Sequence, residues 1–102
     1  MSKKLKILVI RFSSIGDIIL TTPILRCLKS HLNCDIDFLT NRKYQNLLLS
    51  NPNIREIYSL KDKSNDTINF LKDKEYDVII DLQNNFRSLK IRLGLKIKSF
   101  VV

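Results

Sequence analysis

Short apolar runs alternate with amphipathic segments along this chain. Five of the runs are rich in β-branched residues or alternate between polar and apolar positions, which is typical of strands. The predicted strands are residues 6–11, 35–40, 54–60, 76–82 and 97–102. The first reads KILVIR and has no polar residue at its centre, which favours a strand buried on both faces.

Between the strands, apolar residues recur at spacings of three and four, which predicts a helix in each gap. The predicted helices are residues 17–30, 42–50, 64–74 and 87–93. Pro23 interrupts the first of them and predicts either a kink or a second helix after a short first turn. Gly94 follows the last helix and is predicted to cap its C-terminus. Ser64 or Asn65 is predicted to cap the third at its N-terminus.

This alternation predicts an α/β fold, a Rossmann-like three-layer α/β/α arrangement around a parallel sheet. Right-handed crossovers favour the strand order 3-2-1-4-5. At 102 residues the chain has the size of one domain. Its last predicted strand finishes on two valines without a polar tail, so we expect the chain to be part of a longer protein.

The net charge indicates which kinds of molecule the chain is expected to bind. Eighteen basic residues against ten acidic ones give a net charge of +8, which suits nucleic acid, an anionic membrane surface or an anionic substrate. The lysines are scattered and acidic residues lie among them, so a nucleic-acid-binding tail is disfavoured. No apolar run approaches the roughly 20 residues of a membrane span or the core of a signal peptide. We therefore expect a cytoplasmic protein.

The cysteines and the histidine point to no metal site. Cys27 and Cys34 lack a CxxC spacing, and His31 is the single histidine, whereas structural zinc needs four ligands. A disulfide is not expected in the cytoplasm. We predict two buried or half-buried thiols, and we interpret His31 as a residue at a helix C-terminus.

Candidate chemistry gathers after the first predicted strand. Ligands of open α/β sheets bind beyond the carboxyl ends of the strands, where the strand order reverses, and strands one and four flank that point. The loop after the first strand carries Ser13, Ser14 and Gly16, and its backbone N–H groups can hold an anion or a sugar oxygen. Asp17 either complements the helix dipole or acts as a general base that accepts a proton from a hydroxyl. The loop is neither a GxGxxG fingerprint nor a Walker A loop.

The loop after the fourth predicted strand carries a second set of polar side chains. Its amides, guanidinium and hydroxyl suit a polyhydroxylated or anionic ligand, although such a loop can also satisfy its own backbone. These residues are Gln83, Asn84, Asn85, Arg87 and Ser88. Asp81, which ends the strand, is predicted to brace this loop. Arg11, at the end of the first strand, either faces an anionic substrate or pairs with Asp81.

Two segments resemble the motifs of the glycosyltransferase family 9 heptosyltransferases. Residues 6–25, KILVIRFSSIGDIILTTPIL, resemble the family's amino-terminal motif of a buried strand, a basic residue, SSxGD and TxP. Residues 76–88, YDVIIDLQNNFRS, resemble its second motif, in which YDxxIDxQ precedes a basic residue and a serine. The turn at residues 51–54, NPNI, also fits the family.

The resemblance implies the amino-terminal half of a GT-B glycosyltransferase, two Rossmann-like domains facing a cleft. It implies inverting transfer of heptose from ADP-heptose to the lipopolysaccharide inner core, with a lipid A–Kdo acceptor, no metal, and Asp17 as the catalytic base. Ser13, Ser14, Gly16 and Thr22 are then expected to line the cleft, and Arg42, Lys43 and Arg87 are candidates for binding the anionic acceptor. The domain that binds ADP-heptose is expected outside this chain, so these residues alone are expected to be inactive.

Further expectations concern partners. Positive charge on an acceptor domain suits a phosphorylated glycolipid and contact with the cytoplasmic face of the inner membrane. A half of a GT-B enzyme is expected to expose an apolar patch and to self-associate. Two other interpretations remain open: a non-catalytic flavodoxin-like binding module, and a related glycosyltransferase that uses another sugar.

Overall fold

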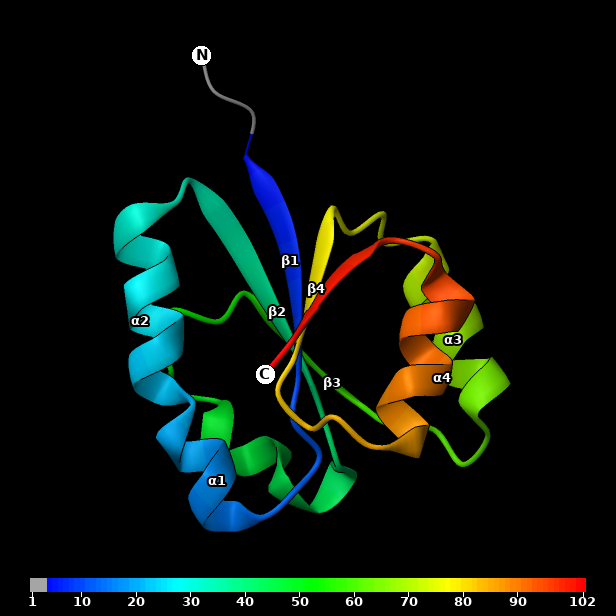
Figure 1. Cartoon of the computed structure of the whole chain (residues 1–102). Helices are drawn as coiled ribbons and strands as arrows, with labels where there is room; N and C mark the ends of the chain where they lie inside the picture. The colour runs from blue at the N-terminus through cyan, green and yellow to red at the C-terminus, as the bar shows by residue number, and fades with distance from the viewer. Residues whose placement is uncertain (1–3) are drawn as a thin grey trace.

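The computed structural model describes residues 4–102. They form a five-stranded, wholly parallel sheet with the order β3-β2-β1-β4-β5, as predicted. The strands are β1 (Leu5–Ile10), β2 (Cys34–Thr40), β3 (Glu56–Ser59), β4 (Val78–Asp81) and β5 (Lys98–Val101). Figure 1 shows α1 and α2 on one side of the sheet and α3 and α4 on the other, which gives the expected three layers.

The helical segments follow the predicted order. They are α1 (Ile15–Leu20), α2 (Thr22–His31), the 3-10 helix η1 (Arg42–Leu48), α3 (Ser64–Lys72) and α4 (Phe86–Leu95). Pro23 separates α1 from α2 by occupying the first turn of the second helix, where its missing N–H costs no hydrogen bond. α3 begins one residue earlier than a Ser64 cap requires, since Lys63 is its N-cap.

The prediction for Gly94 was wrong. Gly94 lies inside α4, and Lys96, with a φ of 56°, ends the helix in the left-handed conformation instead. A Cβ atom at Gly94 would approach the side chain of Ile68 to 2.5 Å, so the glycine lets α4 pack closely on α3. Position 94 therefore requires a glycine because α3 and α4 pack closely there, and not because of its backbone conformation.

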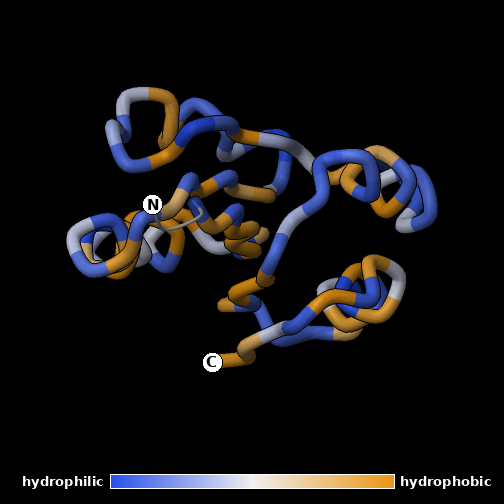
Figure 2. The backbone as a smooth tube through the Cα atoms, turned by 90° about the horizontal axis from the view of Figure 1, so that it is seen from above, coloured by the Kyte–Doolittle hydropathy of each residue, from blue (hydrophilic) through white to orange (hydrophobic). Residues whose placement is uncertain are grey.

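The strand β1 divides the core between the two faces of the sheet. Leu8 and Ile10 point into a cluster with residues of α3 and α4, including Leu71 and Ile91. Ile7 and Val9 point to the other face, where they form a cluster with side chains of α1, α2 and η1. All four β1 residues are at most 1% exposed, which explains why the first predicted strand is continuously apolar. In Figure 2 the central strands are mostly hydrophobic and the helices around them are mixed.

The prediction of buried or half-buried thiols is confirmed for Cys34 and wrong for Cys27. Cys34 is buried in the second core cluster, but Cys27 is exposed on α2. Both cysteines are free. Within residues 4–102 no helix is long and apolar enough to cross a membrane.

Candidate active site

The loops that follow β1 and β4 meet at the carboxyl edge of the sheet, as the strand order predicts. Ile10 is paired with Asp81 in the register, so the two loops leave the sheet side by side. The Leu82 N–H donates to Ile10 O at 2.9 Å, and Arg11 Nη1 donates to Leu82 O at 2.6 Å. The backbone N–H of Phe12 donates to Gln83 Oε1 at 2.9 Å. These bonds join the loops into one site.

Asp17 lies in the first turn of α1 and keeps half of its side chain exposed. Its Oδ2 accepts a hydrogen bond from Ser14 Oγ at 2.9 Å and one from the Ser14 N–H at 3.5 Å. Arg11 Nη2 lies 2.9 Å from the same oxygen. The Ser14 hydroxyl and N–H, followed by the Arg11 guanidinium, lower the pKa of Asp17 below its usual value. The site therefore presents an ionised carboxylate to solvent at neutral pH.

Two arginines at this edge of the sheet each form an ion pair with an aspartate. Arg11 pairs with Asp17 rather than with Asp81. Asp81 is fully buried and pairs with Arg92, whose Nε donates to Asp81 Oδ2 at 2.9 Å. The other oxygen of Asp81 accepts the N–H groups of Gln83 and Asn84 at 3.0 and 2.9 Å. Asp81 therefore braces its loop, as predicted.

The second loop satisfies much of its own backbone. Asn84 has a φ of 49°, a left-handed conformation that asparagine tolerates well. Asn85 caps α4, since its Oδ1 accepts the Ser88 N–H at 2.9 Å, and Ser88 Oγ accepts the Asn85 N–H at 2.9 Å. Ser88 is fully buried, and its hydroxyl also donates to Asn85 O. Ser88 is thus placed as a capping residue and not at the surface where we expected it to contact a ligand.

Not all of the predicted site residues lie together. Arg11 and Ser14 contact Asp17 directly, and Gly16 precedes it in α1. Ser13, the residue before Ser14, donates its N–H to Gln83. Thr22 instead lines a separate pocket of about 380 Å³ with Arg26 and residues 50–53. It is Thr21 that lines the small pocket beside Asp17, together with Arg11, Leu20 and Ile24, and its hydroxyl donates to Ile18 O at 2.6 Å. The prediction that Thr22 shares the Asp17 cleft therefore differs from the structure.

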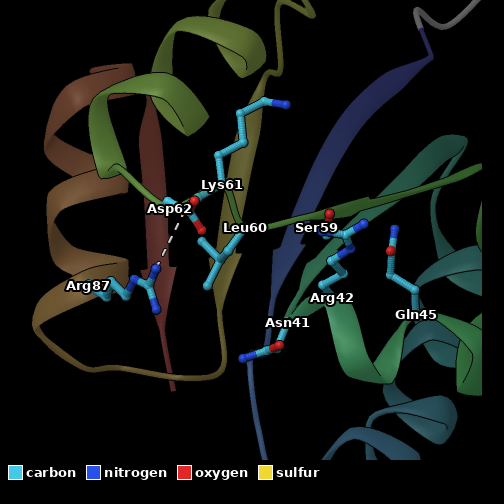
Figure 3. A pocket seen from close by; sticks show the side chains of 8 residues that line it. All are labelled: Asn41, Arg42, Gln45, Ser59, Leu60, Lys61, Asp62 and Arg87. Carbon is cyan, nitrogen blue, oxygen red and sulfur yellow. Dashed lines mark hydrogen bonds between the residues drawn. The ribbon is translucent and has the colours of Figure 1, made fainter.

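A larger pocket of about 730 Å³ opens at the same edge of the sheet (Figure 3). Its lining comes from the segment after β2, from the end of β3 and the loop that follows it, and from the start of α4. The lining residues are Asn41, Arg42, Gln45, Ser59, Leu60, Lys61, Asp62 and Arg87. We call it the arginine pocket, because Arg42 of η1 and Arg87 of α4 both line it.

The other cations near the arginine pocket are directed elsewhere. The Lys61 ammonium lies over the ring of Phe70, 4.9 Å from its centroid, and the Lys61 carbonyl accepts a bond from Arg87 Nη2 at 3.5 Å. Lys43 does not line the pocket, and its ammonium lies over the ring of Tyr44. Two of the three predicted anion-binding candidates, Arg42 and Arg87, thus share one pocket. Sequence reasoning missed Asn41 and Gln45. Their signal is that Asn41 directly follows β2 and that Gln45 lies in η1, the next segment.

The described part of the chain, residues 4–102, contains no group of three or more histidine, cysteine or acidic residues that could hold a metal ion. This edge of the sheet offers the carboxylates of Asp17 and Asp62, backbone and side-chain amides, hydroxyls and two arginines. Such a set can bind an anionic or hydroxylated ligand and accept a proton from it.

Comparisons with known proteins support the resemblance in the sequence motifs. No family model and no curated protein matches the sequence. Among solved structures, the ADP-heptose LPS heptosyltransferase II of Escherichia coli is 26% identical, with a TM-score of 0.86 over 95% of this chain and 30% of its own. A glycosyltransferase family 9 protein from Veillonella parvula is 24% identical, with a TM-score of 0.87 over 99% of this chain and 33% of its own.

The E. coli heptosyltransferase WaaC, solved with ADP, is 17% identical, with a TM-score of 0.76 over 95% of this chain and 35% of its own. This chain spans about a third of the length of each of these structures. Its α/β sheet of five parallel strands is therefore the fold found in part of the heptosyltransferases and of a family 9 glycosyltransferase, the group to which its SSxGD and YDxxIDxQ motifs pointed.

Proposed function

We propose that this chain is the acceptor-side, amino-terminal domain of a family 9 glycosyltransferase that transfers heptose from ADP-heptose to the anionic inner core of lipopolysaccharide. One observation carries the proposal: in a chain with the fold of heptosyltransferases, Asp17 holds an exposed, ionised carboxylate where the loops of β1 and β4 meet. The donor domain lies outside these residues, so the isolated chain is expected to be inactive.

The proposed reaction needs a single carboxylate on the acceptor side. The acceptor hydroxyl attacks the anomeric carbon of the heptose, the new C–O bond forms, and the bond to the ADP phosphate breaks with its electron pair leaving on ADP. Asp17 accepts the hydroxyl proton. An inverting transfer of this kind needs no second carboxylate as a nucleophile. Arg11 and Ser14 hold the Asp17 carboxylate ionised, which leaves it without a proton and able to accept one, and they fix its direction.

The arginine pocket supports an anionic acceptor. Arg42 and Arg87 can each bind a phosphate or carboxylate with two parallel N–H bonds, which a lysine cannot do. The net charge of +8 would draw the chain toward a phosphorylated glycolipid and toward the anionic cytoplasmic face of the inner membrane. We propose that the phosphates or Kdo carboxylates of the acceptor occupy this pocket while its reacting hydroxyl reaches Asp17.

Gly16 supports the same placement of the acceptor. A Cβ atom built on Gly16 meets no atom within 4 Å, and its φ is not positive. Neither the packing nor the backbone of the fold therefore requires a glycine there. We propose that the missing side chain leaves room for the acceptor beside Asp17.

Self-association of the isolated chain follows from its apolar edge. β5 is an edge strand, and Phe100, Val101 and Val102 are 52%, 42% and 79% exposed. An apolar groove of about 400 Å³ lies beside it, lined by side chains that include Val78, Ile80 and Phe100. Exposed edges of this kind pair with other chains. We propose that the 102 residues alone form dimers or larger species, which sedimentation at increasing concentration measures.

The proposed activity is tested by ADP release from the intact transferase that contains these residues. The assay offers ADP-heptose and a Kdo–lipid A acceptor together and each alone, and then replaces ADP-heptose by other nucleotide sugars. Release that requires both ADP-heptose and the acceptor supports the proposal. Acceptor-dependent release from a different sugar nucleotide overturns the heptose assignment, and silence with every donor favours a non-catalytic binding module.

A further inference from the structure

The loop that leads into Asp17 is joined to the loop after β4 by the Gln83 side chain as well as by the bond from Arg11 to Leu82. The last sheet bond of β1 on its β2 side is made by the Arg11 N–H, which donates to Leu39 O at 3.1 Å. Past this point, the N–H groups of Phe12 and Ser13 both donate to Gln83 Oε1, at 2.9 and 3.3 Å. Phe12 is buried, so losing this acceptor would leave its N–H without compensation for its lost water.

The backbone of Gln83 is hydrogen-bonded to Asp81, which forms a buried ion pair with Arg92. Asp81 Oδ1 accepts the N–H groups of Gln83 and Asn84, while Arg92 holds the other oxygen of Asp81. Asp81 is fully buried, and its backbone oxygen accepts the Val102 N–H at 3.1 Å. The position of the Gln83 backbone is therefore fixed by the core of the molecule and not by the exposed loop.

On the other side, the fastened segment leads directly into the surroundings of Asp17. Ser14, which gives Asp17 a hydroxyl and an N–H bond, is the next residue after Ser13. Arg11, which lies 2.9 Å from the Asp17 carboxylate, also donates to the carbonyl of Leu82, the residue before Gln83. Two consecutive residues of the β4 loop thus hold three consecutive residues, 11–13, at the start of the β1 loop.

We infer that Gln83 is a positioning residue: its side-chain oxygen holds the Phe12–Ser13 segment so that Ser14 and Arg11 stay on Asp17. This assigns the sequence-predicted Gln83 an indirect role, through the backbone of the first loop, in place of contact with the ligand. This positioning role rests on the proposed function of Asp17 as a base. The contact of Gln83 with the Phe12 and Ser13 N–H groups does not, and it can be measured without sugar transfer.

The experiment compares Gln83→Met with the wild-type 102-residue chain by NMR. Methionine keeps the length of the side chain and removes the acceptor oxygen. We expect amide exchange at Phe12 and Ser13 to accelerate tenfold or more, and the pKa of the Asp17 carboxyl to rise toward its ordinary value as Ser14 and Arg11 move away. Asn69→Met, which makes a comparable change on an exposed position of α3, is expected to alter neither signal.

Two further variants keep the inference falsifiable if Gln83→Met does not fold. Gln83→Asn retains the amide but withdraws its oxygen by one methylene, and it is expected to accelerate exchange at Phe12 and Ser13. Gln83→Glu keeps an acceptor oxygen at full length and is expected to keep exchange slow. Unchanged exchange and an unchanged Asp17 titration in folded Gln83→Met or Gln83→Asn would overturn the inference, whatever the transferase assay shows.

Discussion

At the scale of single residues, the site depends on how one carboxylate is surrounded. Asp17 could serve only as a helix-start residue, and its contacts with Ser14 are those of such a residue. Arg11 adds a contact that helix capping does not require, because it reaches Asp17 from the end of the neighbouring strand. The contacts with Ser14 and Arg11 that lower the pKa of Asp17 also fix its carboxylate in one direction. Capping and base catalysis are therefore compatible roles for this side chain.

Gly16 provides a prediction at this scale. Replacing Gly16 by alanine is expected to leave the melting temperature unchanged or slightly raised, because the Cβ meets no atom and alanine in a helix is favoured over glycine by about 1 kcal/mol. In the intact transferase we expect the KM for the acceptor to rise roughly tenfold, since small displacements of bound groups are costly. Calorimetry and initial rates measure the two effects. An unchanged acceptor KM would contradict the placement of the acceptor against Gly16.

At the scale of helices and strands, the sequence predicted best those features whose residue pattern has only one structural cause. The continuous apolar run of β1 and the alternation in β2 placed both strands within one residue of their observed bounds. The Gly94 error arose because a glycine near a helix end has two uses, as a left-handed cap and as a site of close approach. Only the tertiary contact with Ile68 separates them, and no spacing in the sequence encodes that contact.

Gly94 provides a second prediction about an alanine substitution. Here alanine is expected to lower the melting temperature, whereas at Gly16 it is not. Gly94→Ala places a Cβ atom 2.5 Å from the Ile68 side chain, and overpacking of this kind costs about 1–3 kcal/mol. The better helix propensity of alanine offsets about 1 kcal/mol of that cost. We expect a net destabilisation of about 1 kcal/mol, or a fall in melting temperature of roughly 4–8 °C. An equal or higher melting temperature would show that Ile68 moves aside without cost.

At the scale of the whole molecule, the strand order determines which loops meet. The order 3-2-1-4-5, predicted from the alternation of elements, is sufficient to bring the loops of β1 and β4 together. It does not say which side chains of those loops face outward. Ser88 and Gln83 are alike as polar loop residues in the sequence, yet one is buried in a cap and the other fastens a neighbouring loop. The arginine pocket was missed as a unit because its residues come from segments far apart in the sequence.

The arginine pocket gives a prediction about ligand binding. Arg42→Ala and Arg87→Ala are each expected to weaken binding of a Kdo–lipid A acceptor to the chain about tenfold, because each removes a charge-assisted bond to an anionic group. Lys43→Ala removes the same charge beside the pocket and not from its lining, so it is the matched control. Titration calorimetry at fixed salt measures the three affinities. Equal losses in all three variants would mean that net charge, and not the pocket, binds the acceptor.

The proposed transfer reaction depends most on Asp17, and the rate of sugar transfer tests that residue directly. The measurement compares ADP release by the intact transferase with that of Asp17→Asn, a variant that keeps the size of the side chain and removes its basicity. We predict a loss of about a hundredfold or more in the transfer rate with the fold retained. A folded Asp17→Asn enzyme that transfers sugar at the wild-type rate would contradict the account and leave Asp17 as a helix-start residue alone.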